Sequence, residues 1–167
     1  MKVAIIGGTG KMGRWFTKFF LDEGIQVIVS GRNKEKLSRV KNEFGVETSD
    51  NINAVKNADR VLISVPIEKF EEVVREIHSH IRPDQVVMDI CSVKEFPVEV
   101  MHKYIKTGTT LGTHPMFGPY AEDIRNQNFI LTPTDNKERR FANDFKRWLE
   151  ERQANVSVTV SYTHLRA

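Results

Sequence analysis

Short runs of apolar residues alternate along the chain with stretches in which apolar residues recur every three or four positions. The runs have the length of strands, and their near-continuous apolar character is typical of strands buried on both faces of a parallel sheet. The expected strands are KVAII (2–6), QVIVS (26–30), RVLIS (60–64), QVVMDI (85–90), TTLGT (109–113), NFILT (128–132) and NVSVTV (155–160).

Two of the intervening stretches have the periodicity of an amphipathic helix, and we expect both apolar stripes to pack in the core rather than to bind a cofactor. Regular alternation of strands and helices predicts an α/β fold with a doubly wound, mostly parallel sheet. The two stripes are Phe70, Val73, Val74, Ile77 and Ile81, and then Phe141, Phe145, Trp148 and Leu149.

Composition narrows the class of protein further. The 167 residues suit one domain, which we place at 1–160, and the single cysteine, Cys91, excludes an internal disulfide. A net charge of +3 is too small to indicate nucleic-acid binding. No apolar run approaches the ~20 residues of a membrane span, so we expect a cytoplasmic protein without a membrane partner. We assign no metal-binding residues. The last seven residues, SYTHLRA (161–167), follow no pattern, and we expect a non-native tail there.

The first expected strand runs directly into a glycine-rich loop. Gly8, Gly10 and Gly13 have the G-x-G-x-x-G spacing between a strand and a helix that is typical of a dinucleotide-binding turn of the Rossmann type. In that interpretation Gly8 permits the tight turn, Gly10 lets the backbone approach a pyrophosphate, and Gly13 lets the helix pack against the strand. We therefore assign the whole segment to the cofactor, the alternative being an ordinary glycine-rich turn. Its residues are Gly8, Thr9, Gly10, Lys11, Met12 and Gly13.

The end of the second expected strand bears on the choice between NAD and NADP. An NAD site usually has an acidic residue there, whereas this strand ends in SGRNKEK, without an acid at residues 30–33. A serine hydroxyl and an arginine fork favour a 2′-phosphate. We assign Ser30, Arg32, Asn33 and Lys36 to the cofactor and predict NADP, with NAD possible; the alternative is a solvated turn and helix start.

Three further strands bring polar or turn residues to the same edge of the sheet, where ligands of doubly wound folds bind. Some of these have a purely structural alternative. In that alternative, Ser92 and Glu95 form a capping box at the start of a helix, and Lys94 is an ordinary surface lysine in its first turn. The alternative for His114 is a histidine with a purely structural role. The residues that converge are Ser64, Val65 and Pro66 from one strand end, Asp89, Ser92 and Lys94 from the next, and Thr113 and His114 from the third. We assign the first three of these to the cofactor.

Four segments together carry a resemblance to a known family. VAIIGGTGKMG, ISVPI, DICSVK and above all GTHPMFGP resemble prephenate dehydrogenase over residues 1 to about 160, and SGRNKEK is similar to NADP-using or archaeal-type members. The resemblance implies oxidative decarboxylation of prephenate to 4-hydroxyphenylpyruvate in tyrosine biosynthesis, with hydride passing to C4 of the nicotinamide. It implies that His114 accepts the proton of the ring hydroxyl and that Ser92 orients this histidine; both are the expected catalytic residues.

Members of that family continue into a helical domain that forms a homodimer and supplies an arginine that binds the substrate. We assign no residue of this chain to the role of that arginine. Prephenate and its amino analogue arogenate both stay open as substrates. Two other functions also stay open. One is another NADP-linked oxidoreductase, of the hydroxy-acid dehydrogenase or F420-dependent NADP reductase type. The other is a non-catalytic domain that senses a dinucleotide, which would have no need for His114 and Ser92.

Overall fold

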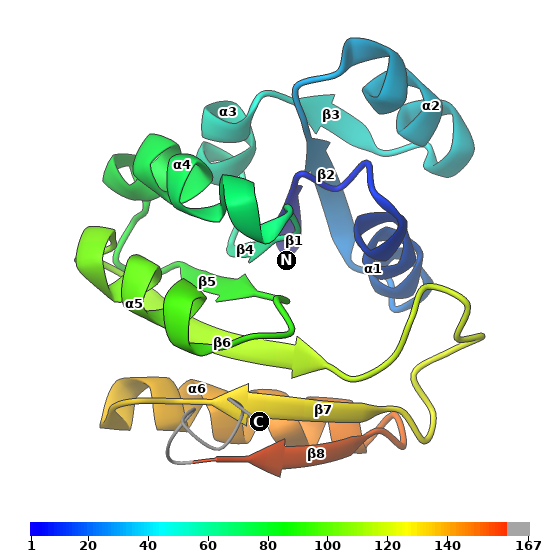
Figure 1. Cartoon of the computed structure of the whole chain (residues 1–167). Coiled ribbons are helices and arrows are strands. Elements are labelled where there is room, and N and C mark those ends of the chain that lie inside the picture. The colour runs from blue at the N-terminus through cyan, green and yellow to red at the C-terminus, as the bar shows by residue number, and fades with distance from the viewer. Residues whose placement is uncertain (160–167) are drawn as a thin grey trace.

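The computed structural model describes residues 1–159, which form one eight-stranded sheet between layers of helices (Figure 1). The strand order is β3-β2-β1-β4-β5-β6-β7-β8, and every neighbouring pair is parallel except β6 and β7. The strands are β1 (Lys2–Ile6), β2 (Gln26–Ser30), β3 (Glu47–Ser49), β4 (Arg60–Ile63), β5 (Val86–Asp89), β6 (Thr109–Pro115), β7 (Asn128–Thr132) and β8 (Asn155–Val158).

Helices cover both faces of this sheet, so the predicted doubly wound α/β fold is confirmed. One buried cluster lies under α1 and α6, and the other lies under α3, α4 and α5 (Figure 1). The helices are α1 (Lys11–Asp22), α2 (Lys34–Phe44), α3 (Asn51–Lys56), α4 (Ile67–Ile77), α5 (Glu95–Tyr104) and α6 (Asn136–Glu150), and a 3-10 turn, η1 (His78–His80), follows α4.

The central strands show why their sequences are apolar at every position. In β1, Val3 and Ile5 belong to the cluster under α1, while Ala4 and Ile6 belong to the cluster on the opposite face. Successive side chains of a strand point to opposite faces, and both faces here are buried. The continuous apolar runs therefore predicted strands of a covered parallel sheet correctly.

Three features of the fold differ from the sequence-based expectation or extend it. The short strand β3, Glu47–Ser49, was not expected, because its three residues are polar and half-exposed or exposed. The strand β7 runs antiparallel to β6, a direction that an apolar run does not encode. The helix α4 ends at Ile77, before Ile81, although Ile81 is still buried.

The C-terminal part of the chain contains the expected last strand. It is β8, Asn155–Val158, which pairs with β7 and ends before Thr159, whereas the expected strand continued to 160. Position 160 and the expected tail 161–167 lie outside the described residues. Among the helices of residues 1–159, none is long and apolar enough to cross a lipid bilayer.

Candidate active site

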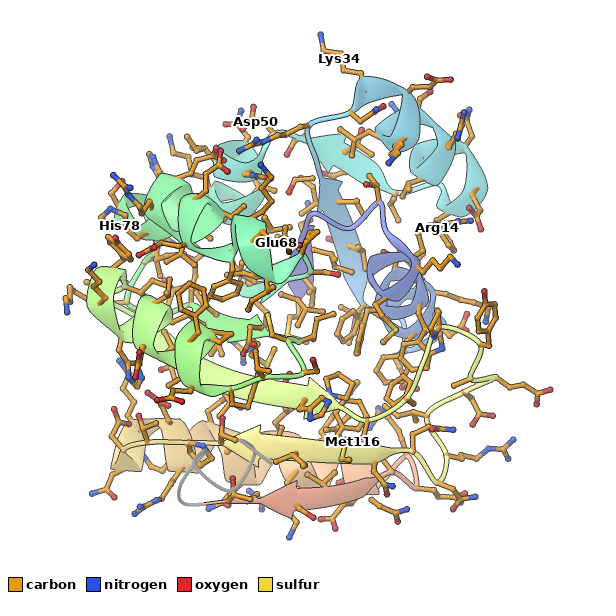
Figure 2. The ribbon with its side chains drawn as sticks, in the orientation of Figure 1. Arg14, Lys34, Asp50, Glu68, His78 and Met116 are labelled. Atoms are coloured by element: carbon orange, nitrogen blue, oxygen red, sulfur yellow. The ribbon has the colours of Figure 1, made fainter. Side chains whose placement is uncertain are left out.

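The loops that follow β1, β2, β4, β5 and β6 lie at one edge of the sheet, because these five strands are parallel. This edge carries the residues that the sequence analysis assigned to the cofactor and to catalysis. The helix starts at this edge include those of α3 and α4, where Asp50 and Glu68 are labelled (Figure 2).

The glycine loop after β1 is held against the end of β2. The backbone N–H groups of Gly7 and Gly8 both donate to the carbonyl oxygen of Ser30, at 3.0 and 3.1 Å. The residue in the left-handed region is Gly7, with φ of 73°, so the expectation that Gly8 permits the tight turn is wrong by one position. The small size of Gly8 serves close packing instead, because a Cβ on Gly13 would lie 2.5 Å from its Cα. The helix therefore packs closely at Gly13, but against Gly8 of the loop after β1 and not against the strand itself.

The start of α1 is open toward the edge of the sheet. Its N-cap, Gly10, provides no side-chain cap, and the first turn has no acidic residue. A Cβ built on Gly10 would meet no atom within 4 Å. The N–H groups of a helix's first turn lack partners inside the helix and favour an anion. The structure of this loop thus fits a pyrophosphate. Met12 faces the core, and any contact from it would come from its backbone N–H.

The residues after β2 divide into a buried and an exposed group. The Ser30 hydroxyl is buried and donates to the Oδ1 atom of Asn51 at 2.7 Å. Asn33 caps α2 by accepting from the backbone N–H of Lys36, at 3.0 Å. The guanidinium of Arg32 and the Lys36 side chain are exposed. Of the four residues assigned to the cofactor here, Arg32 and Lys36 thus have exposed side chains, whereas the hydroxyl of Ser30 contacts Asn51.

The loop after β4 touches the glycine loop directly. The Ser64 N–H donates to the carbonyl oxygen of Ile6 at 2.8 Å, and Pro66 is the N-cap of α4. A Cβ on Gly7 would come within 2.3 Å of Val65 Cγ1. The residues assigned to the cofactor from these two loops are therefore neighbours in space.

A buried ion pair lies behind the ends of β5 and β6. The side chains of Lys94 and Asp89 contact each other and are both fully buried. The Lys94 ammonium also donates to the carbonyl oxygen of Thr113 at 2.6 Å, and the Asp89 carboxylate accepts from the N–H of Cys91 at 3.0 Å and that of Thr113 at 3.3 Å. The alternative of an ordinary surface lysine is wrong. The sequence feature that could have predicted the burial of Lys94 is Asp89, an aspartate at the end of an apolar strand, because a buried carboxylate requires a partner.

This ion pair also decides where α5 begins. The helix starts at Glu95, its N-cap is Lys94, and no side chain caps it. The capping-box interpretation of Ser92 is therefore wrong. The reason is that residues 91–94 form a loop that carries the Lys94 ammonium to Asp89, so the helix starts after Lys94 instead of after Ser92.

His114 lies near the end of β6, directly after Thr113, and is half-buried. Its Nδ1 atom is buried and has no hydrogen-bond partner in the described part of the chain. Burial lowers the pKa of His114, and the positive charge of Lys94 lowers it further, against an opposing effect of Asp89. The imidazole is therefore neutral at pH 7, the state in which a ring nitrogen can accept a proton. Ser92 is exposed and does not supply the missing partner of Nδ1.

The loop after β6 is fastened to α1. The indole N–H of Trp15 donates to the carbonyl oxygen of Ala121 at 2.9 Å, and the ring of Phe117 lies 4.7 Å from that of Trp15. Nearby, the Lys11 ammonium is 3.4 Å from the hydroxyl of Tyr120. The proline-glycine loop after His114 is thus held beside the glycine loop, an arrangement that sequence spacing did not indicate.

Cys91 is the other group of intrinsic reactivity at this edge. Burial and the nearby Asp89 raise the pKa of its thiol to about 12, so it is protonated at neutral pH and is a poor nucleophile. Within residues 1–159, no three His, Cys, Asp or Glu side chains gather in a way that could hold a metal ion.

A sheet of this strand order, with an open helix start directly after its first strand, is the architecture of a Rossmann-type nucleotide-binding domain. Comparison with known families is more specific. Residues 16–158 match the family described as prephenate dehydrogenase, nucleotide-binding domain, and the chain belongs to that family.

The individual relatives include dehydrogenases of this family and one reductase with a different name. The chain is 40% identical to a probable arogenate/prephenate dehydrogenase of Methanocaldococcus jannaschii over 98% of its own length, which is 37% of that relative. It is 32% identical to an F420-dependent NADP reductase of Methanothermobacter thermautotrophicus over 53% of this chain and 42% of the other. The crystal structure of prephenate dehydrogenase from A. aeolicus in complex with hydroxyphenyl propionate and NAD+ superposes with a TM-score of 0.81, at 25% identity, over 99% of this chain and 61% of that one.

Proposed function

We propose that this chain is the cofactor-binding part of an NADP-preferring dehydrogenase that oxidises prephenate or arogenate, with His114 as the group that accepts the proton of the substrate hydroxyl. The observation that carries the proposal is the position of His114. A neutral, half-buried imidazole lies at the edge of the sheet to which the glycine loop and the loop after β4 also belong. The names of the Methanocaldococcus jannaschii and A. aeolicus relatives support the substrate class.

The dinucleotide would lie across the start of α1. The open side of Gly10 and the free N–H groups of residues 11–13 would hold its pyrophosphate. The absence of an acid at the end of β2 and the exposed guanidinium of Arg32 support NADP. When bound, the nicotinamide supplies the hydride acceptor for the oxidation.

His114 has a chemically simple role in this scheme. Loss of hydride from the carbon that bears the hydroxyl gives that carbon carbonyl character, and a neutral imidazole accepts the hydroxyl proton as this happens. Loss of the ring carboxylate as CO2 then returns an electron pair to the ring, which becomes aromatic, and the oxygen regains a proton as a phenol. The ion pair of Lys94 and Asp89 holds the main chain of Thr113 and thereby fixes the position of the next residue. Ser92 is a candidate to contact the substrate hydroxyl from the exposed loop before α5. We further propose that neither the groups that bind the substrate carboxylates nor the dimer contact implied by the family resemblance lies within residues 1–159.

Direct titration of the 167-residue chain with NADPH and, separately, with NADH tests the cofactor assignment. We expect both to bind and NADPH to bind more tightly. A matched variant is Gly10→Asp, because aspartate is a favoured N-cap and the position has space, while its carboxylate repels a pyrophosphate. This variant should fold like the parent chain and lose cofactor binding. Absence of binding to the folded parent chain would reject the proposal.

A second candidate is a reductase that transfers hydride between a deazaflavin and NADP, since the Methanothermobacter relative is an F420-dependent NADP reductase. Such a reaction has no substrate hydroxyl that needs a base. Assays of a protein containing the whole catalytic unit, with prephenate, arogenate and F420, therefore separate the two. Loss of turnover in His114→Asn would support the first proposal.

A further inference from the structure

The guanidinium of Arg32 already has an anionic partner in this structure. Arg32 follows β2, and its Nη2 atom lies 2.5 Å from Oε1 of Glu72, which belongs to α4. The two residues are 40 positions apart in the sequence. Both side chains are more than half exposed, at 61% and 51%. The pair thus joins the loop after β2 to α4, the helix that follows β4.

The space beside this pair contains charges of both signs. A hollow of about 480 Å³ follows the end of β2, and its charged lining residues are Arg32, Lys34, Asp50 and Glu76. Asp50 caps α3 by accepting from the backbone N–H of Asn53 at 2.8 Å, and this bond holds the pKa of Asp50 below its usual range. Glu76 lies one turn after Glu72 and adds to the negative charge that Arg32 faces. The carboxylates that act on Arg32 are therefore those of Glu72 and Glu76, both from α4.

We propose that Glu72 is a determinant of cofactor preference, because it competes with the 2′-phosphate of NADP for Arg32. The inference rests on the proposed binding of a nicotinamide dinucleotide at this edge. A 2′-phosphate binds Arg32 by displacing Glu72, and the displaced carboxylate then lies near a second anion. A ribose with a free 2′-hydroxyl leaves the pair of Arg32 and Glu72 intact. Glu72 therefore weakens NADPH binding and leaves NADH binding unchanged.

Glu72 supplies from α4 a carboxylate that contacts the residue after β2, the part of the chain where an NAD site usually has an acid of its own. The sequence between β2 and α2 predicts NADP, whereas the carboxylate supplied by α4 reduces that preference. A neighbouring carboxylate on the same helix gives a matched control. Glu71 faces away from Arg32 and accepts from the hydroxyl of Tyr104 at 3.0 Å, and Lys103 lies 4.0 Å from it.

The test is a set of dissociation constants for NADPH and NADH, measured by titration of the 167-residue chain and its variants. Glu72→Gln should tighten NADPH binding by about two- to five-fold, the range expected for loss of one competing exposed ion pair. It should change NADH binding by less than about two-fold. Glu71→Gln carries the same change of charge and should leave both constants as in the parent chain. Circular dichroism of each variant checks that the fold is retained.

A second set of variants tests whether the effect of Glu72→Gln on NADPH binding depends on Arg32. In an Arg32→Ala background, Glu72→Gln should no longer alter the ratio of the two constants. The inference is overturned if Glu72→Gln shifts both cofactors equally, if Glu71→Gln gives the same shift, or if the effect persists without Arg32. Failure of the folded parent chain to bind either cofactor would instead reject the proposed function, so the two failures are distinguishable.

Discussion

The side-chain ammonium of Lys94 donates a hydrogen bond of 2.6 Å to the main-chain carbonyl oxygen of Thr113, the residue immediately before His114. The ammonium is fully buried and its counter-charge is Asp89, which in turn accepts from the Thr113 N–H. One ion pair therefore holds both polar groups of the Thr113 main chain. The imidazole that follows is attached to a part of the backbone with little freedom to move.

Removal of this ammonium should destabilise the chain strongly. Lys94→Met leaves the Asp89 carboxylate buried without its counter-charge, and we expect a loss of about 3–5 kcal/mol in the free energy of unfolding. Urea denaturation followed by circular dichroism measures it. The double variant Asp89→Asn with Lys94→Met removes both charges and should recover part of the loss. A double variant no more stable than Lys94→Met would contradict this account of the pair.

Replacement of His114 should separate catalysis from cofactor binding. His114→Asn removes the proton acceptor, and in a protein with the whole catalytic unit we expect kcat to fall by at least ~100-fold. The dissociation constant of NADPH should stay close to that of the parent protein, because the pyrophosphate and ribose contacts come from other loops. Steady-state rates and a binding titration give the two quantities. Near-normal turnover would remove His114 from the mechanism.

The protonation of His114 should be shifted to low pH. Burial and the charge of Lys94 lower its pKa from the ordinary value of 6.5, so the ring stays neutral until the pH falls below that value. Nuclear magnetic resonance of the histidine ring protons, with His114→Asn to assign the signal, should show this residue titrating below pH 6.5. In the whole enzyme kcat/KM should fall on the acid side as the same group protonates. A midpoint above 6.5 would argue against the described environment.

A second histidine, His102, should make the stability of the fold depend on pH, and its pKa is shifted in the opposite direction from that of His114. His102 lies 2.9 Å from the buried carboxylate of Glu138, and this hydrogen bond raises the pKa of His102 above 6.5. A raised pKa in the folded state gives stability that is fully present below the unfolded value and is lost as pH rises through the folded one. His102→Gln should therefore cost more at pH 5.5 than at pH 8.5.

The difference between the two pH values should be at most about 1 kcal/mol, since the His102 ring is partly exposed to solvent. Thermal or urea unfolding of the parent chain and the variant at both pH values measures it. An equal cost at the two pH values would mean that the charge of His102 plays no part in the contact with Glu138.

The features that the sequence predicted well depend on local or strictly periodic signals. A strand such as β1 is apolar at both odd and even positions because both faces are covered, and this is visible in the letters alone. The close packing of Gly13 on Gly8 also follows from a local motif. Lys94 was open to misinterpretation because lysine is mostly exposed in proteins. Its burial depends on Asp89 and on the main chain of Thr113, which only the folded sheet brings together.

Other features depend on contacts between distant segments. The carboxylate at Arg32 comes from Glu72, and no local pattern connects a turn after β2 with the middle of α4. The antiparallel direction of β7 is likewise set by the path of the loop from 116 to 127, not by the composition of the strand. The sequence thus predicted individual residues of the candidate site, such as Arg32, but it did not predict the distant residues, such as Glu72, that contact them.

The bond from Trp15 to the Ala121 carbonyl gives this chain a built-in optical probe. The chain has two tryptophans, and the second, Trp148, lies near the C-terminal end of α6, where the guanidinium of Arg152 is 3.9 Å from the centre of its ring. With Trp148 replaced by phenylalanine, and with light that excites tryptophan but not tyrosine, the emission of the chain would come from Trp15 alone. Its colour and intensity would then report whether the segment after His114 stays fastened to the first helix as ligands enter and leave.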